Sequence, residues 1–169
     1  MELRIRRAST QDAAWLQVSF AQQVKLQKRG RYFADCCRQQ DEGQIVLLFS
    51  EGDGDYLGHV KVVWESEVPY FSENGIPEIQ DLIVVPTHRR KGIATQLLER
   101  AENIIRRRSG VAGICIGLYA DYGAAQRLYV LRGYVPDGNG VVYKDTYVMP
   151  GQTVIVDDDL VLCLTKRLG

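Results

Sequence analysis

The chain has 169 residues, about the length of one domain, and a domain of this size can bury a core without disulfides or metal. Its 46% apolar and 25% charged residues exclude a disordered, collagen-like or coiled-coil protein. Equal numbers of basic and acidic residues, 21 of each, argue against nucleic acid as a partner.

The amino-terminal residues alternate charged and apolar side chains and are followed by no apolar stretch, so we expect no signal peptide. The longest apolar runs, such as 45–49, fall far short of the ~20 residues that a membrane span needs. We therefore predict a cytoplasmic protein without a membrane partner.

The four cysteines include one adjacent pair and no C-x-x-C spacing, and the chain has two histidines, so we predict no metal site. For a cytosolic protein we expect four reduced, mostly buried thiols, at Cys36, Cys37, Cys115 and Cys163. The run Asp157-Asp158-Asp159 could hold a divalent cation, but a hairpin turn or bulge fits it better.

The first half of the chain predicts one strand, two helices and two further strands. Leu3 and Ile5 alternate with arginines as in a short strand, and Ser9 or Thr10 can cap a helix that continues through Phe20. A second helix is expected around 32–37. Strands at 45–49 and 56–65 follow, joined by the hairpin turn 52–55.

The second half predicts strands that alternate with helices. A strand over 78–85 ends at Pro86, and the clearest helix spans 92–108, where apolar residues recur at 3.6-residue spacing. A strand over 111–119, a short helix over 123–132 that Gly133 ends, and strands over 134–143 and 154–165 complete the order. These elements predict one domain, 1–169, with a mixed α+β or α/β fold in which helices cover a sheet.

Charge is distributed unevenly along the chain. Residues 51–81 hold eight acids and one base, whereas residues 82–108 hold seven bases and two acids. The alternatives are charges scattered on solvated faces, or an anion-binding region beside a cation-attracting one.

The junction after the 78–85 strand has the features of a phosphate site. A basic turn containing Gly92 leads into the long helix, whose first amides lack intrahelical partners and whose dipole favours anions. Arg89, Arg90 and Lys91 add full charges, and Gly92 and Ala94 let a ligand approach the backbone. A charged, solvated helix start remains the alternative. Neither a P-loop nor a G-x-G-x-x-G motif after a strand is present.

Two motifs resemble those of the GNAT superfamily of acyl-CoA-dependent N-acetyltransferases. Arg89-x-x-Gly92-x-Ala94 is similar to the family's Q/R-x-x-G-x-G/A signature, and the segment 125–134 resembles its A-x-x-L-Y-x-x-x-G-F/Y motif. The predicted element order also matches over nearly the whole chain. The resemblance implies a twisted, mostly antiparallel sheet of six to seven strands flanked by about four helices.

The resemblance also implies site residues and acetyl-CoA as co-substrate. The strand 82–84 would pair with the pantetheine arm, and the amides of 89–95 would hold the pyrophosphate. Tyr129 would protonate the leaving thiolate. An asparagine that many members carry is here Tyr122, which weakens the assignment of a cofactor contact at that position. The implied cofactor residues are Leu82, Ile83, Val84, Arg89, Arg90, Lys91, Gly92, Ile93, Ala94 and Thr95.

Acetylation requires a neutral amine, and an amine with a pKa near 10.4 is almost entirely protonated at pH 7. A carboxylate can accept that proton, directly or through water. Our candidate is Glu78, 11 residues before Arg89, where several family members carry a catalytic glutamate; Asp81 is the second candidate. Each could instead be a structural acid, Glu78 at an exposed strand end and Asp81 paired with an arginine or a loop. Cys115, in an apolar run, fits a core thiol better than an acyl carrier.

We expect direct transfer of an acetyl group from acetyl-CoA to a primary amine in a ternary complex. The acceptor would be a small-molecule or peptide amine, with the acidic 51–81 segment, the Tyr70-Phe71 loop and the first two helices beside it. A homodimer is possible through the apolar final strand. Two alternatives remain, a non-catalytic acyl-CoA-binding module or sensor and a nucleotide-binding interaction protein.

Overall fold

The computed structural model describes residues 2–24 and 30–169, and the chain divides into two compact units. The first unit comprises Met1–Val63 and Gln80–Ile104, and the second comprises Trp64–Ile79 and Ile105–Gly169. Each unit has its own hydrophobic core.

The first unit contains an antiparallel sheet with helices packed against it. Its strand order is β1-β2-β3-β4, and the β1–β2 and β2–β3 pairs are antiparallel. Its elements are β1 (Arg4–Arg7), α1 (Ala13–Val24), α2 (Tyr32–Asp41), β2 (Ile45–Gly52), β3 (Asp55–Val63), most of β4 (Glu78–Val84) and nearly all of α4 (Ile93–Ile105).

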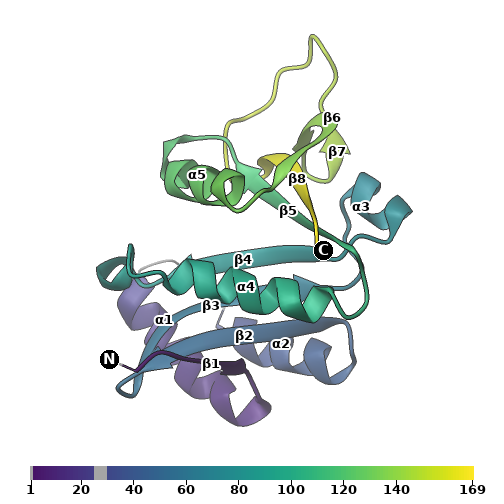
Figure 1. Cartoon of the computed structure of the whole chain (residues 1–169). Coiled ribbons are helices and arrows are strands. Elements are labelled where there is room, and N and C mark those ends of the chain that lie inside the picture. The colour runs from purple at the N-terminus through teal and green to yellow at the C-terminus, as the bar shows by residue number, and fades with distance from the viewer. Residues whose placement is uncertain (1, 25–29) are drawn as a thin grey trace. The chain divides into compact units, whose positions relative to one another are not determined.

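Helices α1 and α2 supply one side of this unit's core. Leu16 and Phe20 recur at helical spacing on α1, and Phe33 of α2 joins them against β2. Strand β2 is buried on both faces, which explains its continuous apolar run. In Figure 1, α4 passes in front of the strands of this unit, whereas α1 and α2 lie behind them.

The start of the first unit is fixed by polar contacts. Ser9 caps a 3-10 turn, and its backbone N–H donates to the Asp12 carboxylate over 2.8 Å. The Arg6 guanidinium donates to both Asp12 oxygens, at 2.9 and 2.6 Å, and its Nε donates to Glu51 at 3.2 Å. These contacts join β1, β2 and the entry to α1, and they identify Ser9, rather than Thr10, as the cap.

The second unit is built around the antiparallel pair β5–β8. Cys115 and Cys163 are direct partners in that pair, and β6 pairs with the other edge of β8. The first two residues of β4 pair in parallel with Gly113 and Ile114. Its further elements are α3 (Pro69–Asn74), β5 (Val111–Gly117), α5 (Gly123–Leu131), β6 (Val135–Tyr143), β7 (Thr146–Tyr147) and β8 (Leu160–Arg167).

The predicted mixed fold with a mostly antiparallel sheet is confirmed. The sheet has eight strands in the order β1-β2-β3-β4-β5-β8-β6-β7, one more than the larger number expected, because the two-residue β7 was not foreseen. Five α-helices are present among the described residues. None of these helices is long and apolar enough to cross a membrane.

Three expectations about the second unit are wrong. Tyr70 and Phe71 lie in α3 rather than in a loop, because Pro69 begins a single helical turn. The last strand begins at Leu160 instead of 154, and Ile155 and Val156 are exposed. The cysteines are not all thiols: Cys115 and Cys163, opposite each other on adjacent strands, form a disulfide, whereas Cys36 and Cys37 are buried thiols.

Candidate active site

Strand β4 contains a left-handed residue at its middle. Asp81 has a φ of 55°, which is uncommon for any residue with a Cβ. Just beyond it, β4 lies so close to β3 that a Cβ added to Gly58 would overlap the Ile83 carbonyl oxygen. The Val85 N–H then donates to the Leu57 oxygen at 2.9 Å. Glycine on β3 is therefore required by the path of β4.

The Asp81 carboxylate is engaged by side chains from two other elements. The Tyr32 hydroxyl of α2 donates to Asp81 Oδ2, and Lys61 Nζ of β3 lies 3.3 Å from the same oxygen. Burial, followed by the Asp81 charge, raises the pKa of Tyr32 far above its usual value, so the phenol keeps its proton. Asp81 is thus an ion-paired carboxylate on the first unit.

The sequence prediction named neither Tyr32 nor the residues behind it. Tyr56 and His59 of β3 are fully buried, and the Tyr56 oxygen lies 2.5 Å from His59 Nδ1. The Phe20 and Phe33 rings pack around His59, with centroids at 5.7 and 5.2 Å. Burial raises the pKa of Tyr56 well above its usual value. An aromatic layer therefore backs the Asp81 cluster.

The predicted phosphate cradle has an open, turn-rich backbone. Arg90 and Gly92 adopt positive φ values of 62° and 79°, and a Cβ at Gly92 would meet nothing within 4 Å. The Gln96 N–H donates to the Gly92 oxygen at 3.1 Å, which begins the hydrogen-bond ladder of α4, and the amides before Gln96 have no partner within the helix. Residues 89–92 are exposed.

The Arg89 side chain is held toward β4, because its Nε donates to the Val84 carbonyl at 3.3 Å. Arg90 and Lys91 are exposed and surround the helix start with positive charge. An anionic group such as a pyrophosphate fits this arrangement of amides, cations and unfilled space. The first unit thus brings the predicted residues 82–84 and 89–95 together.

In the second unit, Glu78 is a buried acid at the start of β4. It is 6% exposed, so the alternative of a solvent-exposed strand-end acid is wrong. Its Oε2 accepts a hydrogen bond of 2.6 Å from Ser66, and the Ser66 oxygen accepts one from the Val68 N–H at 3.1 Å. These two hydrogen bonds orient the Glu78 carboxylate, and both come from the segment that follows β3.

Tyr129 lies on α5 of the same unit and is 5% exposed. Burial raises the pKa of its phenol well above the usual value of 10, so the hydroxyl stays protonated. Its ring lies 6.1 Å from that of Tyr134, whose N–H donates to the Tyr129 carbonyl at the end of the helix. A buried phenol that keeps its proton can act as a proton donor.

Comparison with protein families shows to which family the chain belongs. Residues 10–134 match the model of the "Acetyltransferase (GNAT) family", well over half of the chain. The chain belongs to the GNAT acetyltransferase family. A search of curated protein sequences gives no significant match.

Solved structures of GNAT proteins share this fold at low sequence identity. The acetyltransferase yncA from Salmonella typhimurium, solved with acetyl-CoA, is 20% identical, with a TM-score of 0.69 over 99% of this chain and 94% of that chain. A ribosomal-protein-alanine N-acetyltransferase from Brucella melitensis is 18% identical, with a TM-score of 0.70 over 98% and 99%.

A third structure with this fold is a chimera of spermidine N-acetyltransferase SpeG from Vibrio cholerae and hSSAT. It is 16% identical, with a TM-score of 0.66 over 99% of this chain and 96% of that chain. These likenesses confirm the GNAT fold predicted from the two motifs.

The departure from the GNAT pattern at Tyr122 has a structural role. The Tyr122 ring occupies the space that a Cβ at Gly117 would need, and its hydroxyl donates to Asp158 at 2.8 Å. The Tyr119 hydroxyl donates to the same oxygen. Residues 157–159 form the expected turn, and Asp158 joins it to the segment before α5. No cluster able to hold a metal occurs within 2–24 and 30–169.

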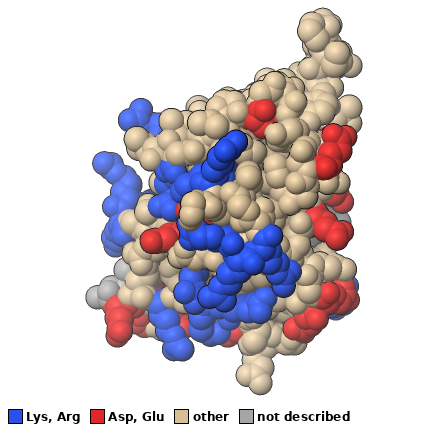
Figure 2. Space-filling model, turned by 45° about the vertical axis from the view of Figure 1, so that its right-hand side comes forward, with Lys and Arg blue, Asp and Glu red and all other residues tan. Residues whose placement is uncertain are grey.

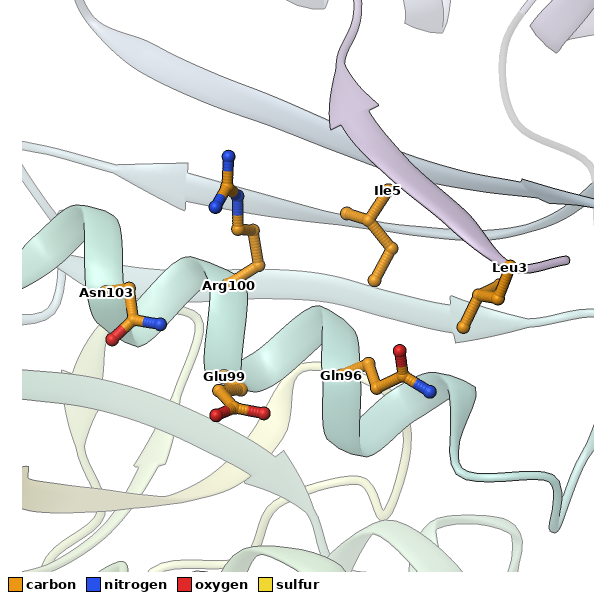
Figure 3. Close-up of a pocket in the computed structure, with 6 residues that line it drawn as sticks. All are labelled: Leu3, Ile5, Gln96, Glu99, Arg100 and Asn103. Atoms are coloured by element: carbon orange, nitrogen blue, oxygen red, sulfur yellow. The ribbon is translucent and has the colours of Figure 1, made fainter.

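A groove of about 360 Å³ lies beside the start of β1 and α4, and Figure 3 shows Ile5 of β1 and the preceding Leu3 facing Gln96 and Arg100 on α4. None of its lining residues belongs to the cradle. Basic side chains cover much of one face in Figure 2, and acidic ones lie mainly along its right-hand edge.

Sequence reasoning missed the residues that support the site. Tyr32, Lys61 and Ser66 act through contacts that are distant in sequence, the longest spanning 49 residues between Tyr32 and Asp81. One signal was available: Gly58 interrupts an apolar strand, and such a glycine marks a close backbone approach.

Proposed function

We propose that this GNAT protein is an N-acetyltransferase that transfers the acetyl group of acetyl-CoA to a primary amine by direct attack in a ternary complex. One observation carries the proposal: in a member of this family, the start of α4 presents first-turn amides, cations and an open glycine in one place. We also propose that 1–169 acts as one catalytic domain in the cytoplasm and can form a homodimer.

Residues of the first unit would hold acetyl-CoA, which supplies an activated acetyl thioester when bound. Backbone groups of Leu82, Ile83 and Val84 are suited to pair with its pantetheine arm. The amides from Arg90 to Thr95, with the charges of Arg90 and Lys91, are suited to its pyrophosphate, whereas the Arg89 N–H donates to the Pro86 carbonyl at 3.3 Å. A backbone amide of β4 would polarise the thioester carbonyl.

Glu78 is the proposed general base. A lysine-like amine pays roughly 4–5 kcal/mol to lose its proton at pH 7, and a carboxylate that accepts this proton lowers the barrier to attack. The hydrogen bond from Ser66 to Glu78 Oε2 orients this carboxylate. Asp81, the second candidate, has its Oδ2 on Lys61 and Tyr32 and is less suited to accept a proton.

Tyr129 is the proposed general acid. As the amine nitrogen bonds to the acetyl carbon, the carbon–sulfur bond breaks and the thiolate takes a proton. The phenol is protonated at neutral pH, so it carries the proton that the thiolate takes. The GNAT resemblance of the segment 125–134 supports this role.

The proposed acceptor is defined only as a primary amine. Proteins with this fold include one named for ribosomal-protein alanine and one named for spermidine. Both are amine acceptors, and we propose a small-molecule or peptide amine for this chain.

The test combines calorimetric titration of acetyl-CoA, CoA and ATP with a thiol-release assay over a panel of amines. Micromolar acetyl-CoA binding and CoA release on at least one amine are expected. Binding without release on any amine would favour the non-catalytic acyl-CoA module, and tighter binding of ATP would favour a nucleotide-binding protein.

A further inference from the structure

We propose that Tyr32 and Lys61 are positioning residues that hold Asp81 in its left-handed conformation and so fix the path of β4 at Leu82. The proposal rests on the proposed function, in which a β4 backbone amide polarises the thioester carbonyl. It assigns Asp81 to the backbone geometry of the site and not to proton transfer.

The backbone at Asp81 requires support. A φ of 55° lies in the left-handed region, which glycine adopts freely and other L-residues disfavour because of their Cβ. Aspartate tolerates this region better than most residues but still needs surrounding contacts to remain there inside a strand. A residue in this conformation redirects the amide that follows it.

The side chain of Asp81 receives that support from two directions. Tyr32 donates from α2 and Lys61 approaches from β3, and both meet Oδ2. Lys61 Nζ also lies 5.7 Å from the centre of the Tyr32 ring, so the three side chains form one cluster. The Lys61 side chain is 14% exposed and that of Asp81 31%, which strengthens their attraction relative to a fully solvated pair.

The backbone after Asp81 is fixed separately. Gly58 admits the Ile83 carbonyl, and Val85 is hydrogen-bonded to Leu57 of β3. The backbone is therefore fixed at Val85, and the Asp81 side chain is fixed by Tyr32 and Lys61. The Leu82 peptide between these two points has a defined orientation. The cluster therefore acts on the amide through backbone geometry.

Replacing Asp81 with glycine separates the two possible roles of this residue. Glycine adopts a positive φ without side-chain support but carries no carboxylate, whereas alanine lacks the carboxylate and disfavours the same φ. The variants are Asp81→Gly, Asp81→Ala, Tyr32→Phe and the double variant Tyr32→Phe/Asp81→Gly. Each is assayed for kcat, the KM of acetyl-CoA, melting temperature and hydrogen exchange of the peptide covering residues 80–85.

We expect Tyr32→Phe and Asp81→Ala to lower kcat about tenfold and to speed exchange in 80–85. Asp81→Gly should keep kcat within about threefold of the unmodified protein, and adding Tyr32→Phe to it should change neither kcat nor exchange further. Equal loss in Asp81→Gly and Asp81→Ala would overturn the proposal, because the carboxylate itself would then be required. So would unchanged exchange in Tyr32→Phe.

The exchange measurement distinguishes failure of this proposal from failure of the proposed function. It reports the β4 backbone whether or not the protein turns over. The unmodified protein could release no CoA while Tyr32→Phe still speeds exchange and Asp81→Gly abolishes that effect. This result would reject the proposed transferase function and support the positioning role of Tyr32 and Lys61. The Asp81→Gly melting temperature controls for general unfolding.

Discussion

Glu78 and Tyr129 are the residues on which the proposed chemistry depends, and both are nearly buried. Glu78 is oriented by Ser66, whereas Tyr129 is held within a short helix. Their substitutions should affect turnover while leaving acetyl-CoA binding intact, because the cradle belongs to other residues.

Glu78→Gln should lower kcat about 100-fold, the usual scale of losing a general base, while the calorimetric Kd for acetyl-CoA stays within twofold. The amide oxygen can still accept the hydrogen bond from Ser66, so this contact is retained. Ser66→Ala is the matched variant and should lower kcat by several-fold only. An unchanged kcat in Glu78→Gln would contradict the assignment.

Tyr129→Phe should lower kcat by about 10- to 100-fold with little loss of stability, because it removes a proton donor and keeps the ring. Burial raises the Tyr129 pKa, so deprotonation of this phenol should not reduce kcat between pH 7 and pH 10. Tyr143→Phe on β6, a residue we place outside the chemistry, serves as the control. An unchanged kcat in Tyr129→Phe would rule out the acid role.

At the scale of elements, the close approach of β3 and β4 gives a test of the fold. Gly58→Ala places a Cβ against the Ile83 carbonyl, a backbone atom that cannot rotate away. We expect a loss of about 1–3 kcal/mol in the free energy of unfolding, measured by urea denaturation. Gly110→Ala, whose Cβ would meet nothing within 4 Å, should be close to neutral.

The contact between β1 and the entry to α1 predicts a pH dependence of stability. The Arg6 guanidinium lowers the pKa of Asp12 from 3.8 to about 2. A lowered carboxyl pKa stabilises the fold above pH 4, and this contribution is lost as pH falls from about 4 to about 2. It amounts to at most roughly 2 kcal/mol.

Urea midpoints at several pH values for the unmodified protein and Asp12→Asn test this dependence. The variant should be less stable at pH 7, and the difference should shrink between pH 4 and pH 2. A difference that stays constant with pH would contradict the role of the Asp12 charge.

The elements that sequence predicted well are those with strong periodicity. Helix α4 was foreseen because its apolar residues recur on one face, and β2 because it is a continuous apolar run. Helix α3 was missed because six residues contain too little periodicity, and Ile155 and Val156 were assigned to a strand that begins later. The cradle residues could be predicted because they lie in one local motif. The Asp81 cluster could not, because Tyr32 and Lys61 are distant from Asp81 in the sequence.

At the scale of the whole molecule, the Cys115–Cys163 disulfide departs from the expected four thiols and is unusual for the cytoplasm that we propose. Denatured protein without reductant should accept two thiol labels per chain, and four after reduction. The 48-residue separation predicts that reduction lowers stability by roughly 4 kcal/mol on the chain-entropy model. Four labels without reductant would show that the pair is reduced.

The central claim is that this chain binds acetyl-CoA at the start of α4, and calorimetric titration tests it most directly. The account predicts a micromolar Kd for acetyl-CoA, at least tenfold weaker binding of ATP, and at least tenfold weaker acetyl-CoA binding in Gly92→Val, which fills the open space of the cradle and strains its backbone at a φ of 79°. Absence of heat and of saturable acetyl-CoA binding in the unmodified protein would contradict it.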